Sequence, residues 1–440
     1  MSAATPARRA AFEVLRRTFE HGAWANRAFP AAAERHRLEG RELAQAQRLA
    51  FGAVQRRGTT DALASRLSDR DLATLDPPVR AALRLGLFEV LFSDAAPDHA
   101  AVDAAVELAK GGMRRGGARR AAGAAGLVNA VLRRAAIERE ALLGSLADDD
   151  PAGAATAHSV PEWLARMWWE ELGAQPARSL LRVINEPPET ALRVNTVRAE
   201  PAALRAELEA AGEAVAAGAP VGGIAVPEAL VWTGPLGAAA RAGLGSGALF
   251  AQSRAAQAVV SLLDPSPGER VLDLCAGPGV KTTLIAARMR GKGEVVAVER
   301  DAGRAGQIAD LCERAGVGNV RVEVADAGFA DAGRGYDRVL VDPPCSDLGT
   351  LASRPDARWR KDPATIARLA AEQAAILARG LAALRPGGVL VYSTCTISSR
   401  ENREVLATSA VPAEEWSLVE TRPDRDRTDG FFIAALRGTA

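Results

Sequence analysis

Cysteine is scarce in this sequence, and its few cysteines lie far apart. Cys275, Cys312, Cys345 and Cys395 are the only ones among 440 residues. None of the pairs has the close spacing of a zinc knuckle, and the chain lacks the dense cysteine pattern of a secreted disulfide scaffold. We therefore expect reduced thiols, no bound metal and a cytoplasmic location.

Long apolar segments are also missing. No stretch reaches the roughly 20 residues that a membrane-spanning helix requires. Residues 1–6 lack the charged start and apolar core of a secretory leader. The hydrophobic fraction of 48% and the charged fraction of 25% are ordinary for a globular protein. The sequence thus argues against a membrane protein and against a secreted one.

The whole chain has no large excess of positive or of negative charge, since its formal net charge is +1. Residues 1–140, however, carry 23 Lys and Arg against 16 Asp and Glu, a net of +7. The remaining residues carry 32 against 38, a net of −6. A basic front part suggests a local anionic partner, of which RNA is one candidate. A solvated helical surface would have the same composition.

The chain is too long for one ordinary domain, and its pattern changes twice. Residues 1–145 have apolar residues at helical spacing, which predicts an all-α domain. Residues 146–250 begin with an acidic linker at 148–151 and continue with helices and short strands, such as one at 222–226, which predicts a small α+β domain. Residues 251–440 alternate strands and helices, which is typical of an α/β domain with a doubly wound, largely parallel sheet.

Five strand-like runs define this last domain. They cover residues 270–274, 294–298, 320–324, 337–341 and 388–392. Open sheets of this kind bind ligands beyond the carboxyl ends of their strands. The residues that follow these runs are therefore the candidates for a functional site.

A glycine-containing turn follows the first run. Residues 275–281 read Cys-Ala-Gly-Pro-Gly-Val-Lys, and such a turn lets a ligand approach the backbone and the N-terminus of the next helix. A dinucleotide fingerprint would need a third glycine at Thr282, and a phosphate-binding P-loop would need a longer loop that ends in Gly-Lys-Ser/Thr. The turn fits neither motif.

Carboxylates follow the second and third runs. Glu299 can accept hydrogen bonds from ribose hydroxyls, and Asp326 is placed to accept one from an adenine amino group. Either residue alone is equally well explained as a solvated loop carboxylate. Together with the glycine turn, they predict a site for S-adenosylmethionine.

Two cysteines follow the fourth and fifth runs. Residues 342–346 read Asp-Pro-Pro-Cys-Ser and residues 392–396 read Tyr-Ser-Thr-Cys-Thr, so adjacent strand ends would bring Cys345 and Cys395 together. A thiolate that adds to C6 of cytosine makes C5 nucleophilic enough to accept a methyl group. Asp342 can hydrogen bond N3 and the exocyclic amine of that base. The alternatives are a disulfide or two small buried side chains.

With these motifs, nearly the whole chain resembles the bacterial 16S ribosomal RNA cytosine-C5 methyltransferases of the RsmB (Fmu/Sun) type. Further matching segments are residues 83–86, 98–102, 128–134, 185–188, 192–196 and 429–432. The resemblance implies a NusB-like helical RNA-binding domain at 1–145, a linker and small α+β RNA-binding subdomain at 146–250, and a Rossmann-like methyltransferase domain at 251–440. It also implies a monomer that acts on 16S rRNA, either free or in a partly assembled small subunit.

The resemblance assigns roles to individual residues. It makes Cys395 the nucleophile and gives Cys345 a role in product release. Asp342 is the third catalytic candidate, because its hydrogen bonds to the base would stabilise the adduct. The contacts that it implies for S-adenosylmethionine are Cys275, Ala276, Gly277, Pro278, Gly279, Val280, Lys281, Glu299, Asp326 and Asp342. Arg354 and Trp359 match a family segment beside the substrate RNA.

Two positions depart from the family pattern. Val280 stands where a second glycine commonly precedes the lysine, and its larger side chain would restrict the backbone near the methionine part of the cofactor. Residues 252–254 read Gln-Ser-Arg, where Gln-Asp is commoner. Neither change removes a catalytic group.

Two other functions remain compatible with the sequence. A cytosine-C5 methyltransferase acting on tRNA or another RNA would carry the same catalytic motifs. A noncatalytic RNA-binding factor built on the NusB-like domain would need neither cysteine and no cofactor carboxylate. Spacing alone also leaves open which cysteine attacks, since DNA cytosine methyltransferases use the one in the position of Cys345.

Overall fold

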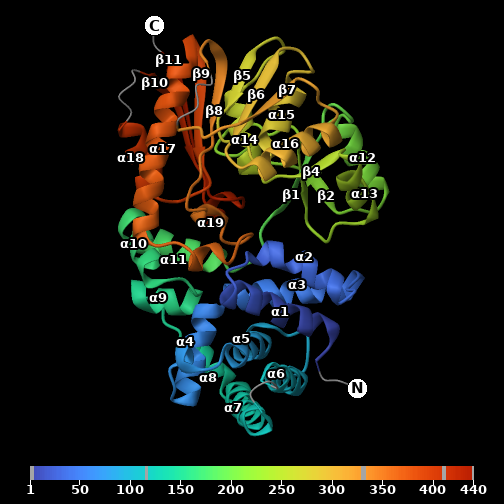
Figure 1. Ribbon diagram of the computed structural model, residues 1–440, viewed down its shortest axis with the longest axis vertical. Helices are drawn as coiled ribbons and strands as arrows, with labels where there is room; N and C mark the ends of the chain where they lie inside the picture. Colours follow the sequence, from blue (N-terminus) through green and yellow to red (C-terminus); the bar gives the residue numbers. More distant parts are fainter. Residues whose placement is uncertain (1–3, 114–116, 329–332, 409–412, 439–440) are drawn as a thin grey trace. The chain divides into compact units, whose positions relative to one another are not determined.

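The computed structural model describes residues 4–113, 117–328, 333–408 and 413–438. The chain forms two compact units (Figure 1). One contains Met1–Glu186 and Leu351–Arg360, and the other contains Pro187–Thr350 and Lys361–Ala440. None of the helices within the described ranges has the length and apolarity needed to cross a lipid bilayer.

Within its described residues, the first unit consists of helices and connecting loops. They are α1 (Pro6–Glu20), α2 (Ala25–Arg35), α3 (Gly40–Gln55), α4 (Arg57–Ser68), η1 (Leu72–Thr74), α5 (Pro77–Phe92), α6 (Asp98–Gly112), α7 (Ala118–Ile137), α8 (Arg139–Gly144), α9 (Pro151–His158), α10 (Glu162–Leu172), α11 (Ala174–Val183) and η4 (Ala357–Trp359). The all-α prediction for the N-terminal part is therefore confirmed.

Helix α5 forms the centre of this unit, and 13 of its 16 residues are buried. Prolines in its first turn suit a helix start, where the missing N–H is not needed. A Cβ at Gly86 would lie 2.5 Å from Leu132 of α7, so glycine allows the two helices to pack closely. Arg8 of α1 and Glu89 of α5 form a buried ion pair at 2.7 Å. Apolar packing and this ion pair together join α1 to α5.

The acidic run at 148–151, expected to be a linker, is instead a helix start. Asp150 caps α9 by accepting a hydrogen bond from the backbone N–H of Gly153 at 2.8 Å, and Pro151 occupies the first helical position. Asp148 accepts hydrogen bonds from Arg178 at 2.5 Å and shares one with His158 at 3.0 Å. The expectation was wrong because an acidic Asp-Pro sequence has the composition of a loop but also the chemistry of an N-cap.

A ten-residue segment from the C-terminal half of the sequence belongs to this first unit. Within Leu351–Arg360, Arg358 is fully buried and donates to the carbonyls of Ser159 at 3.1 Å and Ile184 at 3.2 Å, and to the side-chain oxygen of Asn185 at 2.9 Å. Burial lowers the pKa of Arg358 to about 9. These neutral acceptors bind both terminal nitrogens of a guanidinium that is costly to bury, while its Nε has no hydrogen-bond partner among the described residues.

The second unit begins with a small antiparallel sheet of order β2-β3-β1-β4. Its elements are β1 (Thr190–Val194), α12 (Pro201–Ala210), β2 (Val215–Ala217), β3 (Ala229–Trp232), α13 (Ala238–Ser246) and β4 (Leu249–Ala251). The strand expected at 222–226 is not formed, and only an isolated bridge joins Val221 to Ile224 among the described residues. Gly222 and Gly223 both have positive φ angles there, which interrupts extended structure.

A seven-stranded sheet of order β10-β11-β9-β8-β5-β6-β7 forms the rest of this unit. Its elements are α14 (Arg254–Leu263), β5 (Arg270–Asp273), α15 (Val280–Arg288), β6 (Glu294–Glu299), α16 (Ala302–Ala315), β7 (Val320–Val324), β8 (Tyr336–Val341), η3 (Leu348–Thr350), α17 (Pro363–Ala383), β9 (Leu384–Thr394), η5 (Ser399–Glu401), α18 (Arg403–Ala407), β10 (Ala413–Glu420), α19 (Pro423–Asp426) and β11 (Phe432–Gly438). Strands β5 to β9 are parallel, and β10 and β11 add an antiparallel edge. All five predicted strands are confirmed.

Helices cover both faces of this sheet, as a doubly wound fold requires. Alternate residues of β5, such as Val271 and Leu272, enter two separate apolar cores. Helices α14, α15 and α16 pack on the first core, and α17 and α18 pack on the second (Figure 1). Because β5 to β9 run parallel, their carboxyl ends meet at one edge of the sheet.

Candidate active site

The turn between β5 and α15 is shaped by two glycines. Gly279 has a φ of +104°, a region that L side chains rarely adopt. A Cβ at Gly277 would lie 2.0 Å from a carboxylate oxygen of Glu299, so any side chain there would displace that carboxylate. The backbone N–H of Ala276 donates to Val298 at 2.9 Å, which ties the turn to the end of β6. The predicted cofactor turn and Glu299 are thus brought together.

The two carboxylates predicted for the cofactor differ in exposure. Glu299 is buried at the end of β6, and its Oε1 accepts from the backbone N–H of Asp301 at 2.9 Å. Asp326 follows β7, is exposed, and accepts from the N–H of Gly328 at 2.9 Å. Both lie at the same sheet edge as the glycine turn, since β6 pairs with β5 and β7 pairs with β6.

Asp273, at the end of β5, is a buried carboxylate that the sequence analysis did not single out. Thr282 donates to its Oδ2 at 2.8 Å, while its Oδ1 has no hydrogen-bond partner among the described residues. Burial raises the pKa of Asp273 to about 7. An unsatisfied acceptor beside the glycine turn fits a ligand that carries N–H groups or positive charge, as S-adenosylmethionine does.

The raised pKa of Asp273 predicts a pH-dependent stability. Its pKa is about 7 in the folded chain and 3.8 ordinarily. Its contribution to the free energy of unfolding is therefore fully present below pH 4 and is lost as the pH rises through 7. Asp273→Asn should remove this loss, on the order of 2 kcal/mol between pH 5 and pH 8. Thermal unfolding at both pH values measures it. An equal change of Tm with pH in both proteins would contradict the prediction.

Cys345 and Cys395 meet at the ends of β8 and β9, as predicted. Their sulfur atoms are 3.3 Å apart. Cys345 is buried and Cys395 is half-buried, and the Sγ of Cys395 also lies 3.3 Å from Oδ1 of Asp347. No disulfide joins the four cysteines, all of which lie in the described part of the chain. The sulfurs and the Asp347 carboxylate lie within 4.8 Å of one another, which suits metal ligation, so the absence of a metal stays a prediction.

Lys281 ends the cofactor turn, and its side chain is half-buried. Nζ of Lys281 lies 2.5 Å from Oδ2 of Asp342, whose Oδ1 accepts from Ser393 at 2.8 Å. Burial alone would lower the pKa of Lys281, but Asp342 and the nearby Cys395 raise it above its ordinary value. A nearby cation favours the thiolate form of a cysteine. Lys281 therefore stabilises negative charge at this edge of the sheet.

Glu401 links the two cysteine loops, and the sequence analysis missed it. Its fully buried carboxylate accepts from the backbone N–H of Ser346 at 2.8 Å, from the hydroxyl of Ser346, and from Gln373 at 3.1 Å. The Ser346 hydroxyl lies 2.6 Å from that of Thr396. Ser346 follows Cys345 and Thr396 follows Cys395, so one carboxylate positions both loops. In the sequence, Glu401 is only a glutamate six positions after Cys395. Composition cannot distinguish such a residue from a glutamate on the surface.

Both departures from the family pattern lie at helix starts, Val280 at the first residue of α15 and Ser253 at the N-cap of α14. The carbonyl of Val280 accepts from the buried Arg193 of β1 at 2.8 Å, and Arg193 also donates to Thr283 at 3.1 Å, which joins the small sheet to the start of α15. Ser253 caps α14 through the N–H of Ala256 at 3.4 Å, so a serine performs the capping role that an aspartate can also perform.

Arg354 and Trp359, predicted to contact RNA, lie in the first unit and not in the unit that carries the cysteines. Arg354 is exposed. Trp359 is half-buried, and its indole N–H donates to the carbonyl of Val54 at 3.0 Å. The indole is thus engaged in packing within the helical unit.

Comparisons with known proteins agree with this architecture. Residues 260–437 match the family described as 16S rRNA methyltransferase RsmB/F, residues 5–137 match the NusB family, and residues 160–232 match the RsmF/B-like ferredoxin-like domain. A probable ribosomal RNA small subunit methyltransferase B of Synechocystis sp. is 32% identical over 98% of this chain and 99% of its own length. The chain belongs to the RsmB/F family of 16S rRNA methyltransferases.

A second relative and a solved structure extend the match. A probable ribosomal RNA small subunit methyltransferase B of Bacillus subtilis is 31% identical in an alignment that covers 98% of this chain and 99% of the relative's length. The crystal structure of PH0851 has a TM-score of 0.78 at 25% identity and covers 98% of each chain. Family membership confirms the predicted fold: a NusB-like helical part, a small α+β part and a Rossmann-like methyltransferase sheet.

Proposed function

We propose that this protein transfers a methyl group from S-adenosylmethionine to C5 of a cytosine in 16S rRNA through a covalent cysteine adduct. The observation that carries the proposal is the 3.3 Å approach of Cys345 and Cys395 beside the glycine turn. Two thiols at this distance suit a reaction that needs one nucleophile and a second group next to the same base. We expect the protein to act in the cytoplasm as a monomer.

The cofactor would be held by the residues around the glycine turn. The residues assigned to it are Cys275, Ala276, Gly277, Pro278, Gly279, Val280, Lys281, Glu299, Asp326 and Asp342. The close contact of Gly277 with Glu299 and the unsatisfied Oδ1 of Asp273 support this assignment. When bound, S-adenosylmethionine supplies an electrophilic methyl group.

In the proposed reaction, the thiolate of Cys395 forms a bond to C6 of the target cytosine. Charge then accumulates on the ring, and C5 becomes the nucleophile that takes the methyl group. Asp342 is placed to hydrogen bond the pyrimidine edge. Both of its oxygens already accept one hydrogen bond, and a carboxylate oxygen has capacity for a second. The target base must leave its stack, since C6 is otherwise inaccessible.

Product release requires that the C5 proton leave before the bond between sulfur and C6 breaks. We assign this step to Cys345, whose sulfur is next to that of Cys395 and therefore close to C5 of a base bound there. Lys361 lies beside this cysteine, with Nζ 3.3 Å from the Cys345 carbonyl and 3.8 Å from Asp347. Its ammonium group therefore lies next to the loop that carries Cys345.

One assay distinguishes the proposed function from its two alternatives, methylation of another RNA and RNA binding without catalysis. The purified protein, given labelled S-adenosylmethionine, should methylate a single cytosine in naked 16S rRNA or in partly assembled small subunits, and mapping the product identifies the base and the preferred substrate. Methylation of tRNA with none of rRNA would favour the same chemistry on another RNA. Binding of rRNA without methyl transfer to any RNA would favour a noncatalytic factor.

A further inference from the structure

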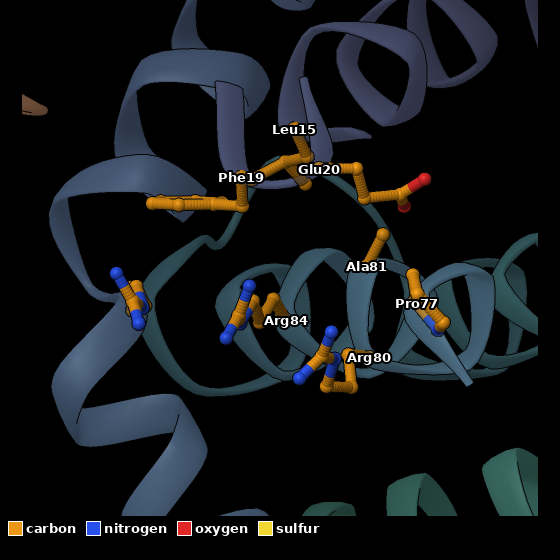
Figure 2. A pocket seen from close by; sticks show the side chains of 8 residues that line it. Leu15, Phe19, Glu20, Pro77, Arg80, Ala81 and Arg84 are labelled. Carbon is orange, nitrogen blue, oxygen red and sulfur yellow. The ribbon is translucent and has the colours of Figure 1, made fainter. Parts of the chain in front are cut away.

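A small cavity opens on the helical unit, and none of the residues that line it takes part in the proposed reaction. It has a volume of about 90 Å³ and is lined by Leu15, Phe19, Glu20, Arg57, Pro77, Arg80, Ala81 and Arg84. In Figure 2, Arg80 and Arg84 extend from α5, and Phe19 and Glu20 extend from α1. The volume is far below the roughly 300 Å³ or more of sites for drug-sized ligands. It nevertheless exceeds the space that a single water needs.

The charges around this cavity do not balance. Arg84 forms a bidentate pair with Asp61, with both distances 2.7 Å, and Glu20 is paired with Arg16 at 2.7 Å. Arg57 lies 3.6 Å from the same Asp61, whose charge Arg84 already neutralises. Among the described residues, no carboxylate pairs with Arg80, which donates to the carbonyl of Ala73 at 3.3 Å. Two positive charges are therefore left at the cavity.

Arg57 and Arg84 are also held in place by aromatic rings before any ligand arrives. The guanidinium of Arg57 lies 4.7 Å from the ring centre of Phe19 and 5.0 Å from that of Trp359, and that of Arg84 lies 4.8 Å from Phe19. Burial, together with the charge of Arg84, lowers the pKa of Arg57. Ordering these side chains in advance reduces the entropy that binding would otherwise cost. The repulsion between them is relieved by an anion.

We propose that this cavity binds one phosphate group of the RNA backbone, through the guanidinium groups of Arg57 and Arg80. Arginine forks match the oxygens of a phosphate, and the cavity has room for one such group. This proposal deepens the proposed function, on which it rests for the identity of the nucleic acid. It gives Trp359 a positioning role, since its ring supports Arg57.

The test measures the salt dependence of RNA binding by the full-length protein, without cofactor, on a 16S rRNA transcript. Arg80→Gln removes one guanidinium and strands no carboxylate. It should weaken binding about fivefold to tenfold. It should also reduce the slope of log Kd against log salt by about 0.7 to 0.9, the value for one phosphate contact. Arg48→Gln, which removes an exposed arginine of α3, is the matched control and should change neither. An unchanged slope in Arg80→Gln, or an equal change in both variants, overturns the proposal.

A second measurement distinguishes RNA from a free phosphate compound. Thermal unfolding is compared in inorganic phosphate and in chloride at equal ionic strength. Stabilisation of the parent protein by phosphate, lost in Arg80→Gln while the RNA slope is unchanged, would assign the cavity to a small phosphate ligand and overturn its assignment to RNA. Binding is measured without cofactor, so the two proposals can fail separately. If the protein methylates rRNA but Arg80→Gln leaves the salt slope unchanged, only the phosphate-binding proposal is refuted. If Arg80→Gln reduces the slope but the parent protein does not methylate RNA, only the proposed reaction is refuted.

Discussion

Cys395→Ala is expected to lower the rate of methyl transfer by a factor on the order of 10⁴ to 10⁶, because the variant has no thiolate to add to C6 of the target. It should form no covalent complex with RNA. Cys345→Ala keeps the nucleophile but lacks the group assigned to product release, so it should accumulate a protein–RNA adduct. A denaturing gel after incubation with rRNA and S-adenosylmethionine measures both outcomes.

Cys312→Ala provides the control for these variants. Cys312 is buried on α16 within an apolar core, and burial raises its pKa to about 11, so it has no nucleophilic role. This variant should methylate RNA like the parent protein and accumulate no adduct. An adduct in Cys395→Ala together with none in Cys345→Ala would exchange the two roles. No adduct in either would exclude the covalent route.

Glu401→Ala is expected to destabilise the fold by about 3 to 5 kcal/mol. It leaves the backbone N–H of Ser346 buried without its acceptor, and the Gln373 amide keeps only the carbonyl of Pro344. Cys345 and Cys395 should then lose their fixed separation, and a displacement of about 1 Å at a reacting group costs roughly 100-fold in rate. Chemical denaturation measures the first effect. The kcat of the folded protein at saturating RNA measures the second.

Two variants separate positioning from mere loss of charge. Glu401→Gln retains an acceptor for Ser346 N–H, and the hydroxyls of Ser346 and Thr396 can accept from its amide, so its stability should stay within about 1 kcal/mol of the parent. Glu404→Ala removes an exposed carboxylate of α18 and should cost less than about 0.5 kcal/mol. A Glu401→Ala protein with full stability and unchanged kcat would refute the positioning role.

The sheet and its cysteine pair could be predicted because they depend on local patterns. Each parallel strand is a short apolar run, and parallel strands place whatever follows them at one edge. Knowing where two strands end was therefore enough to predict that Cys345 and Cys395 lie close together. The glycine turn and Glu299 follow the same rule, which makes the core of the candidate site accessible to sequence reasoning.

The remaining parts depend on partners that are distant along the chain. Glu401 is buried because Ser346 and Gln373 surround it, and no periodic pattern marks a glutamate for burial. Arg358 resembles a surface arginine until the carbonyls of Ser159 and Ile184 are placed around it. Sequence reasoning assigned the neighbouring Trp359 to RNA, although its hydrogen bond is to Val54. Long-range hydrogen bonds of this kind have no signature in composition or spacing.

The arrangement of Leu351–Arg360 has a consequence for biosynthesis. A ribosome finishes Met1–Glu186 and must then add the 164 residues of Pro187–Thr350 before the segment that completes the helical unit emerges. At ordinary rates of translation this takes roughly 10 to 30 s. Until then the carbonyls that accept hydrogen bonds from Arg358 lack this donor. A fragment truncated after residue 186 is therefore an unfinished folding unit, and the nascent chain completes its first unit only after strands β5 to β8 of the second have been synthesised.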